Sequence, residues 1–299
     1  MVDQIRADQA KLAKKERYAV GKLLQALRLE RPTYYDERIR IAKYHDKYAE
    51  VKAKIYEIAQ RGLVRGRYTL GYRRIQSFLV EQGIHLADGT VLRLMNEMGV
   101  QVKLYNQHRN HCYSSYRGTI GKVPKNLLRQ KFNATKPYQV LHTDVSQVKL
   151  ANQQWAYISA VIDEASKEVL AFQIGAHPNA QLIKSTLSEL KMKLPDEATP
   201  IIHSDQGWHY QLAYYTQKIS EEGFTQSMSR KGNCLDNAPM ESFFHLYKTE
   251  LLSNRPLCKD LAELSQLSHD YIHFFNYERI SLKTKGMTPV AYRNHAYKA

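Results

Sequence analysis

Residues 140–150 read VLHTDVSQVKL, and this stretch predicts a β-strand that carries one acid, Asp144. Apolar and β-branched residues recur along it, which favours a strand. Two more acids follow in informative contexts, Asp205 in IHSDQGWHY (202–210) and Glu241 in DNAPMESFFHLYKTE (236–250). Residues 206–240 separate these two. The surrounding patterns place the first two acids on or after strands and the third on a helix, where all three can face one cleft.

The rest of the second half alternates between strand and helix patterns. Three strands in a meander are followed by strands that alternate with helices, which predicts a mixed five-stranded sheet flanked by helices. This is an α/β fold, and strand-end acids with one helical acid are the layout of a ribonuclease-H-like nuclease. The expected strands are 140–150, two within 155–175 around a turn at 163–166, 199–207 and 224–230, and the expected helices are 179–193, 210–221, 236–253 and 261–280.

The first hundred residues predict helices only. A break at Arg31-Pro32 precedes residues 38–61, which lack Gly and Pro, repeat apolar residues at helical spacing and stop at Gly62. Between 69 and 98, two short helices flank Gly83, and Asp88 is the expected cap of the second. Two short helices around a tight turn outline a helix-turn-helix, although an ordinary helical hairpin gives the same pattern.

Four domains are therefore expected. They are an N-terminal helical region for DNA binding or assembly (1–62), a helix-turn-helix-like DNA-binding domain (63–100), a basic linker (101–131) and a ribonuclease-H-like core with C-terminal helices (132–299).

Charge is distributed unevenly along the chain. Residues 1–131 hold 27 Lys and Arg against 12 Asp and Glu, whereas residues 132–299 hold 17 of each, so the first half carries the whole excess of +15. Such an excess is the electrostatic footprint of a phosphate-binding protein, and it predicts a DNA-binding arm joined to a charge-balanced body. The alternative is a soluble basic helical domain.

Composition excludes several classes of protein. No apolar run approaches the roughly 20 residues that span a bilayer, and the charged N-terminus has no secretory pattern. Three cysteines without paired spacing exclude a disulfide framework, so a reducing bacterial cytoplasm is expected.

The linker mixes Arg, Lys, Tyr and Gly without a period, which fits either contact with DNA or a plain solvated segment. A zinc site at His108, His111 and Cys112 lacks the further ligands of a zinc finger.

The three acids predict a site for divalent cations. Carboxylate oxygens are the ligands that hard ions such as Mg²⁺ prefer, together with phosphate oxygens. Two such ions can activate a water or a 3′-hydroxyl and stabilise the leaving oxygen at a phosphodiester. The expected cofactor is therefore Mg²⁺, in two ions per site and with Mn²⁺ as a substitute.

The chain resembles the bacterial insertion-sequence transposases of the insertion-sequence-three group, which have an integrase-type (rve) core. Upstream of this core, LGYRRI (70–75) and VLRLMNEMG (91–99) resemble the helix-turn-helix of the family. The motifs of the core are HTDVS (142–146), HSDQGWHY (203–210), SRKGNCLDNAPMESFF (229–244), LYKTE (246–250), YIHFFNYERISL (271–282) and TPVAY (288–292). The chain departs from the family at Leu141, where a tryptophan is usual, and at 145–147, where Ile-Thr-Tyr is usual.

The resemblance implies that Asp144, Asp205 and Glu241 are the catalytic and metal-binding DDE triad. Lys248, seven residues after Glu241 and on the same helical face, is expected to reach a phosphate beside the metals. Asn237 is expected to orient the site or contact DNA, with Asp236 capping the helix if it does neither. His203 flanks Asp205 or is a structural histidine, and Asp163 is structural. The candidates for DNA contact are Arg73, Arg74, Arg93, Arg230, Lys231, Asn237 and Lys248.

The implied activity is nicking and joining of double-stranded DNA at terminal inverted repeats and in target DNA, by a copy-out and paste-in route. A homodimer or larger synaptic assembly at the nucleoid, away from membranes, is expected because two DNA ends must meet. Two alternatives stay open: a DNA-binding regulator derived from a transposase, and a ribonuclease-H-like nuclease without strand transfer.

Overall fold

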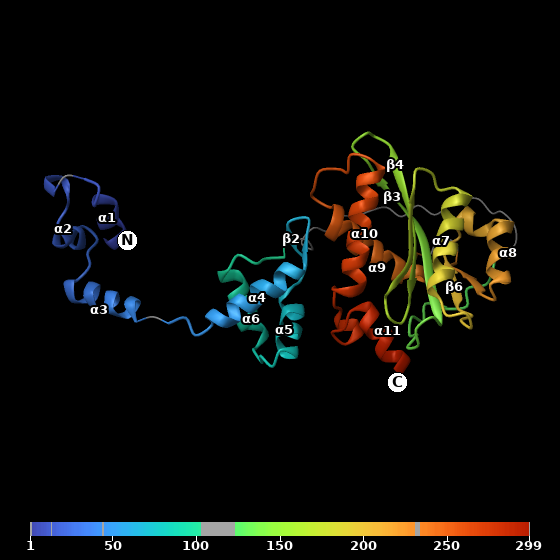
Figure 1. Ribbon diagram of the computed structural model, residues 1–299, viewed down its shortest axis with the longest axis horizontal. Coiled ribbons are helices and arrows are strands. Elements are labelled where there is room, and N and C mark those ends of the chain that lie inside the picture. The colour runs from blue at the N-terminus through green and yellow to red at the C-terminus, as the bar shows by residue number, and fades with distance from the viewer. Residues whose placement is uncertain (1, 13, 44, 103–122, 231–233, 299) are drawn as a thin grey trace. The chain divides into compact units, whose positions relative to one another are not determined.

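The computed structural model describes residues 2–12, 14–43, 45–102, 123–230 and 234–298 (Figure 1). The chain forms two compact units, Met1–Val51 and Lys52–Ala299. The division falls inside one helix, before the expected boundary after residue 62, and the assignment of four domains stays a prediction. Among the described residues, no helix is both long and apolar enough to cross a membrane.

The first unit consists of short helices around a small apolar cluster. The cluster contains Val2, Leu23, Leu24 and Tyr34. The helix expected over 38–61 is instead two helices, because the Asp46 carboxylate accepts a hydrogen bond from the Tyr48 N–H at 2.9 Å and starts a new one. The elements are α1 (Val2–Gln9), a 3₁₀ turn (Lys14–Glu16), α2 (Val20–Ala26), α3 (Arg31–Ala42) and the start of α4 (Ala49–Arg61).

A small helical subdomain opens the second unit. It contains the rest of α4, a hairpin of β1 (Leu63–Val64) and β2 (Arg67–Tyr68), α5 (Tyr72–Glu81) and α6 (Asp88–Glu97). Ile75 of α5 and Leu94 of α6 are fully buried, as their helical spacing predicts. Asp88 lies in the first turn of α6 rather than at its cap, which is Ala87. The hairpin turns through Arg65 and Gly66, both with positive φ.

The core is a mixed five-stranded sheet, as predicted. Its strands are β3 (Val140–Lys149), β4 (Trp155–Asp163), β5 (Val169–Gly175), β6 (Ile201–Ser204) and β7 (Thr225–Met228). The spatial order is β5-β4-β3-β6-β7. The first three strands pair antiparallel, whereas β6 pairs parallel with both β3 and β7. This is the ribonuclease-H-like arrangement that the order of patterns predicts.

Helices cover both faces of the sheet (Figure 1). Along β4, Ile158, Ala160 and Ile162 pack toward α9 (Ala238–Tyr247) and α10 (Leu261–Tyr277), while Val161 packs toward α7 (Ala180–Lys193) and α8 (Ala213–Glu221). Side chains of a strand alternate between faces, so a strand buried on both sides is apolar throughout. The remaining elements are 3₁₀ turns at Trp208–Gln211, Cys234–Asn237 and Leu282–Thr284, and helix α11 (Pro289–Lys298).

The helix expected over 236–253 changes type along its length. After α9 ends at Tyr247, residues Lys248–Leu252 form a π-helical turn. Its Glu250 is fully buried and accepts hydrogen bonds from the Tyr271 hydroxyl at 2.8 Å and from the Arg279 guanidinium, with Nη2 at 2.8 Å from Oε1. Single π-turns inside helices are often found at functional sites, and here a buried ion pair holds the turn.

Replacing Arg279 by leucine is expected to lower the free energy of unfolding by about 3–5 kcal/mol, because the buried Glu250 carboxylate loses the guanidinium that neutralises it. Chemical denaturation of the whole chain measures this loss. Arg61→Leu is the matched control, since Arg61 pairs with Glu57 at 2.7 Å on the surface and its loss is expected to cost less than about 1 kcal/mol. Equal effects of the two substitutions would contradict the role given to the buried pair.

Candidate active site

Parallel pairing of β3 with β6 brings two of the predicted acids together. The register aligns Leu141 with Ile202 and His142 with His203. Continued by two residues, the same register places Asp144 beside Asp205. Residues two apart on a strand share a face, so both acids lie on the face that α9 covers.

Asp144 is half-buried, and its Oδ1 accepts a hydrogen bond from the Val145 N–H at 2.8 Å. Burial raises the pKa of this carboxyl well above its usual range, and the charges of Asp205 and Glu241 raise it further. The Lys248 ammonium acts in the opposite direction. The charges of Asp205, Glu241 and Lys248 therefore all lie within range of Asp144.

Asp205 is held in a turn where a side chain larger than that of glycine would crowd it. Its Oδ1 accepts a hydrogen bond from the Gly207 N–H at 2.8 Å, and burial raises the pKa of the carboxyl. A Cβ at Gly207 would lie 2.9 Å from that same oxygen and 2.9 Å from Cε1 of His209. The close approach, rather than an unusual φ, explains the glycine in HSDQGWHY.

Glu241 and Lys248 come from the helical layer. Glu241 lies in the first turn of α9, two residues after Pro239, and is exposed. Lys248 begins the π-helical turn and is half-buried, so that burial lowers the pKa of its ammonium while the charge of Asp144 raises it. The helix therefore brings both side chains toward the strand acids, as their spacing predicts.

A buried polar network lies beside the two aspartates. His142 places Nδ1 3.1 Å from Oδ1 of Asn237 and Nε2 2.8 Å from Oε2 of Glu164. The Asn237 amide also donates to the Thr143 carbonyl at 3.2 Å. The network ties the start of α9 to β3 next to Asp144, which favours the orienting role of the two roles predicted for Asn237.

The sequence reasoning missed His142 and Glu164. The signal for His142 is a repeated spacing, since His142 precedes Asp144 in HTD as His203 precedes Asp205 in HSD. His203 itself is fully buried, with Nδ1 2.8 Å from the Ser227 hydroxyl and Nε2 3.2 Å from the Ser229 hydroxyl. These contacts are those of a structural histidine.

Asp236 does not cap α9, because Asn237 occupies the N-cap position. The Asp236 carboxylate instead accepts hydrogen bonds from Arg230, whose Nε lies 3.0 Å from Oδ2, and from the side-chain amides of Asn126 and Gln130, each at 2.8 Å. These donors hold its pKa far below the usual range, with Arg230 the largest influence. Arg230 stays 59% exposed in its side chain, so its predicted DNA contact is sterically open.

The other DNA-contact candidates lie on the helical subdomain or outside the described residues. Arg73 is exposed, with its guanidinium 5.5 Å from the Tyr72 ring centroid, and Arg74 donates to the Thr69 carbonyl at 3.0 Å. Arg93 pairs with Glu97 one turn away. Lys231, most of the expected linker and the residues of the zinc hypothesis (His108, His111 and Cys112) lie outside the described residues.

The chemistry of the acids fits a hard divalent cation. Carboxylates crowded by burial and like charge are stabilised by a cation, and their oxygens are suitable ligands. In the parts of the chain that are described, however, no three His, Cys, Asp or Glu side chains are gathered closely enough to hold an ion. The ligand chemistry is thus present around Asp144, although the three carboxylates do not form a closed site.

The buried His203 predicts a pH-dependent stability. Burial lowers the pKa of its imidazole to about 4, from about 6.5 in an unfolded chain. Because the folded-state pKa is the lower one, the stabilisation is complete above about pH 6.5 and is lost as pH falls toward 4. We expect His203 to account for a loss of about 2 kcal/mol between pH 7 and pH 5.

Urea denaturation of wild type and His203→Gln at each pH gives the free energy of unfolding as a function of pH. The contribution of His203 is the difference between the two pH dependences. Exposed His269→Gln is the matched control. Burial also lowers the pKa of His209 to about 4, so part of the pH dependence is expected to remain in the variant. Parallel curves for His203→Gln and wild type would contradict the assignment.

Comparison with known sequences agrees with this geometry. The sequence matches the integrase core domain family over residues 134–234, a second integrase core domain family over 241–297, and an HTH-like domain family over 46–108. The first two matches cover the sheet with its acids and the C-terminal helices. The third covers the helical subdomain and confirms the predicted helix-turn-helix-like region.

Two curated insertion-sequence proteins and one solved structure are similar to the chain. InsK, a transposase candidate of insertion sequence element IS150 from Escherichia coli (strain K12), is 38% identical over 280 residues, covering 94% of this chain and 95% of the relative. Transposase InsF of insertion sequence IS3A, from the same organism, is 27% identical over 238 residues, covering 79% of this chain and 80% of the relative. The HTLV-2 integrase catalytic core domain, solved in complex with magnesium, matches 54% of this chain and 99% of its own, with 13% identity and a TM-score of 0.41.

The geometry and the comparisons agree. The acids of HTD and HSD lie on paired strands and the third acid on a helix, and the chain matches the integrase core families and a relative over nearly its full length. The chain belongs to the bacterial insertion-sequence transposases of the insertion-sequence-three group, with an integrase core and an HTH-like domain.

Proposed function

We propose that this transposase nicks and joins DNA at insertion-sequence ends by metal-dependent phosphoryl transfer, with Asp144, Asp205 and Glu241 as its catalytic acids. One observation carries the proposal. The parallel register of β3 and β6 sets Asp144 beside Asp205, on the face from which Glu241 also raises the pKa of Asp144. Acids that are separated in sequence and brought to one place in the fold are typical of a reaction centre.

The three carboxylates would hold Mg²⁺ or Mn²⁺, in two ions. When bound, the ions would polarise the scissile phosphodiester and lower the pKa of the attacking hydroxyl. Asp205 has its carboxylate fixed by Gly207, and Asp144 by the Val145 N–H. Glu241 is exposed at the start of α9, so we propose that it moves toward the aspartates when DNA and metal bind.

Two transfers would occur at this one site. In the first, a water attacks a phosphorus at the end of the element, the P–O3′ bond breaks, and a 3′-hydroxyl and a 5′-phosphate result. In the second, that 3′-hydroxyl attacks another phosphodiester, whose own P–O3′ bond breaks. Each step exchanges one P–O bond for another, so ATP is not needed. Lys248, drawn toward Asp144, would bind the phosphate being transferred.

The remaining parts of the proposal concern partners and place. The HTH-like domain and the N-terminal helices would bind the terminal inverted repeats, aided by the basic linker. Two or more copies would assemble to pair two ends. The route would be copy-out and paste-in, in the bacterial cytoplasm at the nucleoid. Arg73, Arg74, Arg93, Arg230 and Lys231 remain the proposed DNA contacts, whereas Asn237 is proposed to orient the start of α9.

Asp144→Asn and Glu241→Gln are each expected to reduce nicking and joining of terminal-repeat DNA at least a hundredfold in Mg²⁺, because each removes a metal ligand without changing side-chain size. Gel analysis of labelled DNA ends measures both steps. Asp196→Asn, an exposed acid on the loop after α7, is the control and is expected to keep full activity. Strand transfer that persists in Asp144→Asn would refute the triad.

The same assay separates the alternatives. A regulator derived from a transposase would bind the ends and leave them uncut in Mg²⁺ and in Mn²⁺. A nuclease without strand transfer would nick the ends and join none. The proposal predicts both products, their loss on addition of EDTA, and their return when excess Mg²⁺ is restored.

A further inference from the structure

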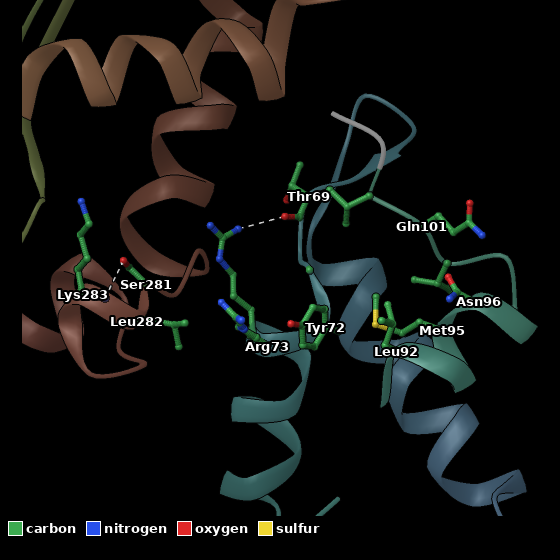
Figure 2. A pocket seen from close by; sticks show the side chains of 14 residues that line it. Thr69, Tyr72, Arg73, Leu92, Met95, Asn96, Gln101, Ser281, Leu282 and Lys283 are labelled. Carbon is green, nitrogen blue, oxygen red and sulfur yellow. Dashed lines mark hydrogen bonds between the residues drawn. The ribbon is translucent and has the colours of Figure 1, made fainter. Parts of the chain in front are cut away.

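A groove lies between the helical subdomain and the C-terminal part of the core. Its volume is about 920 Å³, and it is lined by the start of α5, the second half of α6 and the turn at 281–283. Figure 2 shows Tyr72 and Arg73 on one side and Ser281, Leu282 and Lys283 on the other. The groove is therefore shared by an HTH-like domain and an integrase core that meet within one compact unit.

The charged side chains that line the groove all have the same sign. They are Arg73, Arg74 and Lys283, and the lining contains no Asp or Glu. Arg73 and Lys283 are exposed, and within the described part of the chain neither forms an ion pair with an acid. Two exposed like charges, Arg73 and Lys283, on a groove whose lining holds no acid indicate an anionic ligand.

Three arginines fix the wall of the groove to the core. Arg65 donates to the Leu251 carbonyl at 3.3 Å and Arg67 to the Asn254 carbonyl at 2.7 Å, both from the β1–β2 hairpin. Arg255 donates back to the Val64 carbonyl. The hairpin is thereby attached to the end of the π-helical turn that starts at Lys248, which fixes the segment just before the groove to the core.

We propose that this groove binds the phosphate backbone of duplex DNA, with Arg73 contacting one phosphate and Lys283 another. Such a site would guide DNA from the HTH-like domain toward the core on a single chain. The polar side chains of Tyr72, Asn96 and Ser281 can donate to further phosphate oxygens, which is the usual way that proteins position a duplex without reading its sequence. This inference rests on the proposed function and adds Lys283, a residue of the core, to the DNA-binding surface.

Salt-dependent binding tests the groove without catalysis. The full chain is titrated with a duplex of unrelated sequence in EDTA, between about 0.1 and 1 M salt, and the slope of log affinity against log salt is measured. Loss of one phosphate contact reduces the magnitude of the slope by about 0.9. The loss of affinity relative to wild type is then about eightfold larger at 0.1 M salt than at 1 M salt. Arg73→Gln and Lys283→Gln are each expected to show this change, and the double variant about twice the change in slope.

Two controls make the result specific. Lys259→Gln removes an exposed positive charge outside the groove and is expected to keep the wild-type slope, while Lys283→Arg keeps the charge and is expected to restore binding. A Lys283→Gln slope equal to that of Lys259→Gln would overturn the proposal. The proposal would also be overturned if Lys283→Gln lost binding of poly-glutamate while its DNA binding stayed unchanged. That result would mark the groove as a site for an acidic protein. Failure of the catalytic proposal shows separately, as strand transfer by Asp144→Asn.

Discussion

The parallel pairing of β3 with β6 is the constraint on which the rest of the site depends. These strands are separated in sequence by two antiparallel strands and α7, yet their register sets His142 beside His203 and, two residues on, Asp144 beside Asp205. A slip of one residue would move one aspartate to the face packed by α7 and α8. Buried polar contacts oppose that slip, because it would take His142 from Asn237 and Glu164, and His203 from Ser227 and Ser229.

The helical layer then brings the remaining groups to the aspartates by means of buried polar contacts. At one end of α9, Asn237 joins His142 and the Thr143 carbonyl, which sets the start of the helix and with it Glu241. At the other end, Glu250 binds Arg279 and Tyr271 and holds the π-helical turn that begins at Lys248. Buried polar groups are costly unless they are satisfied, so these two contacts specify one position for the helix.

Sequence reasoning recovered the parts of this structure that depend on local pattern. Strand and helix periodicity located the five strands and the helix over 180–193. The triad, assigned from its motifs and the family resemblance, stays a prediction. Sequence reasoning missed features that depend on tertiary contacts. In the sequence, Glu250 gives no sign of its buried partner Arg279, and Asp236 resembles a cap although it binds Arg230. The start of a new helix after Asp46 was readable in principle, since aspartate is a common N-cap residue, but the lack of Gly and Pro concealed it.

The central claim is that Asp144, Asp205 and Glu241 together bind divalent cations. Electron paramagnetic resonance of Mn²⁺ added to the full chain, with and without terminal-repeat DNA, measures that binding independently of turnover. The account predicts that bound Mn²⁺ is strongly reduced in Asp144→Asn and in Asp205→Asn, and unchanged in Asp196→Asn. Equal Mn²⁺ binding by wild type and by both active-site variants, with DNA present, would contradict it.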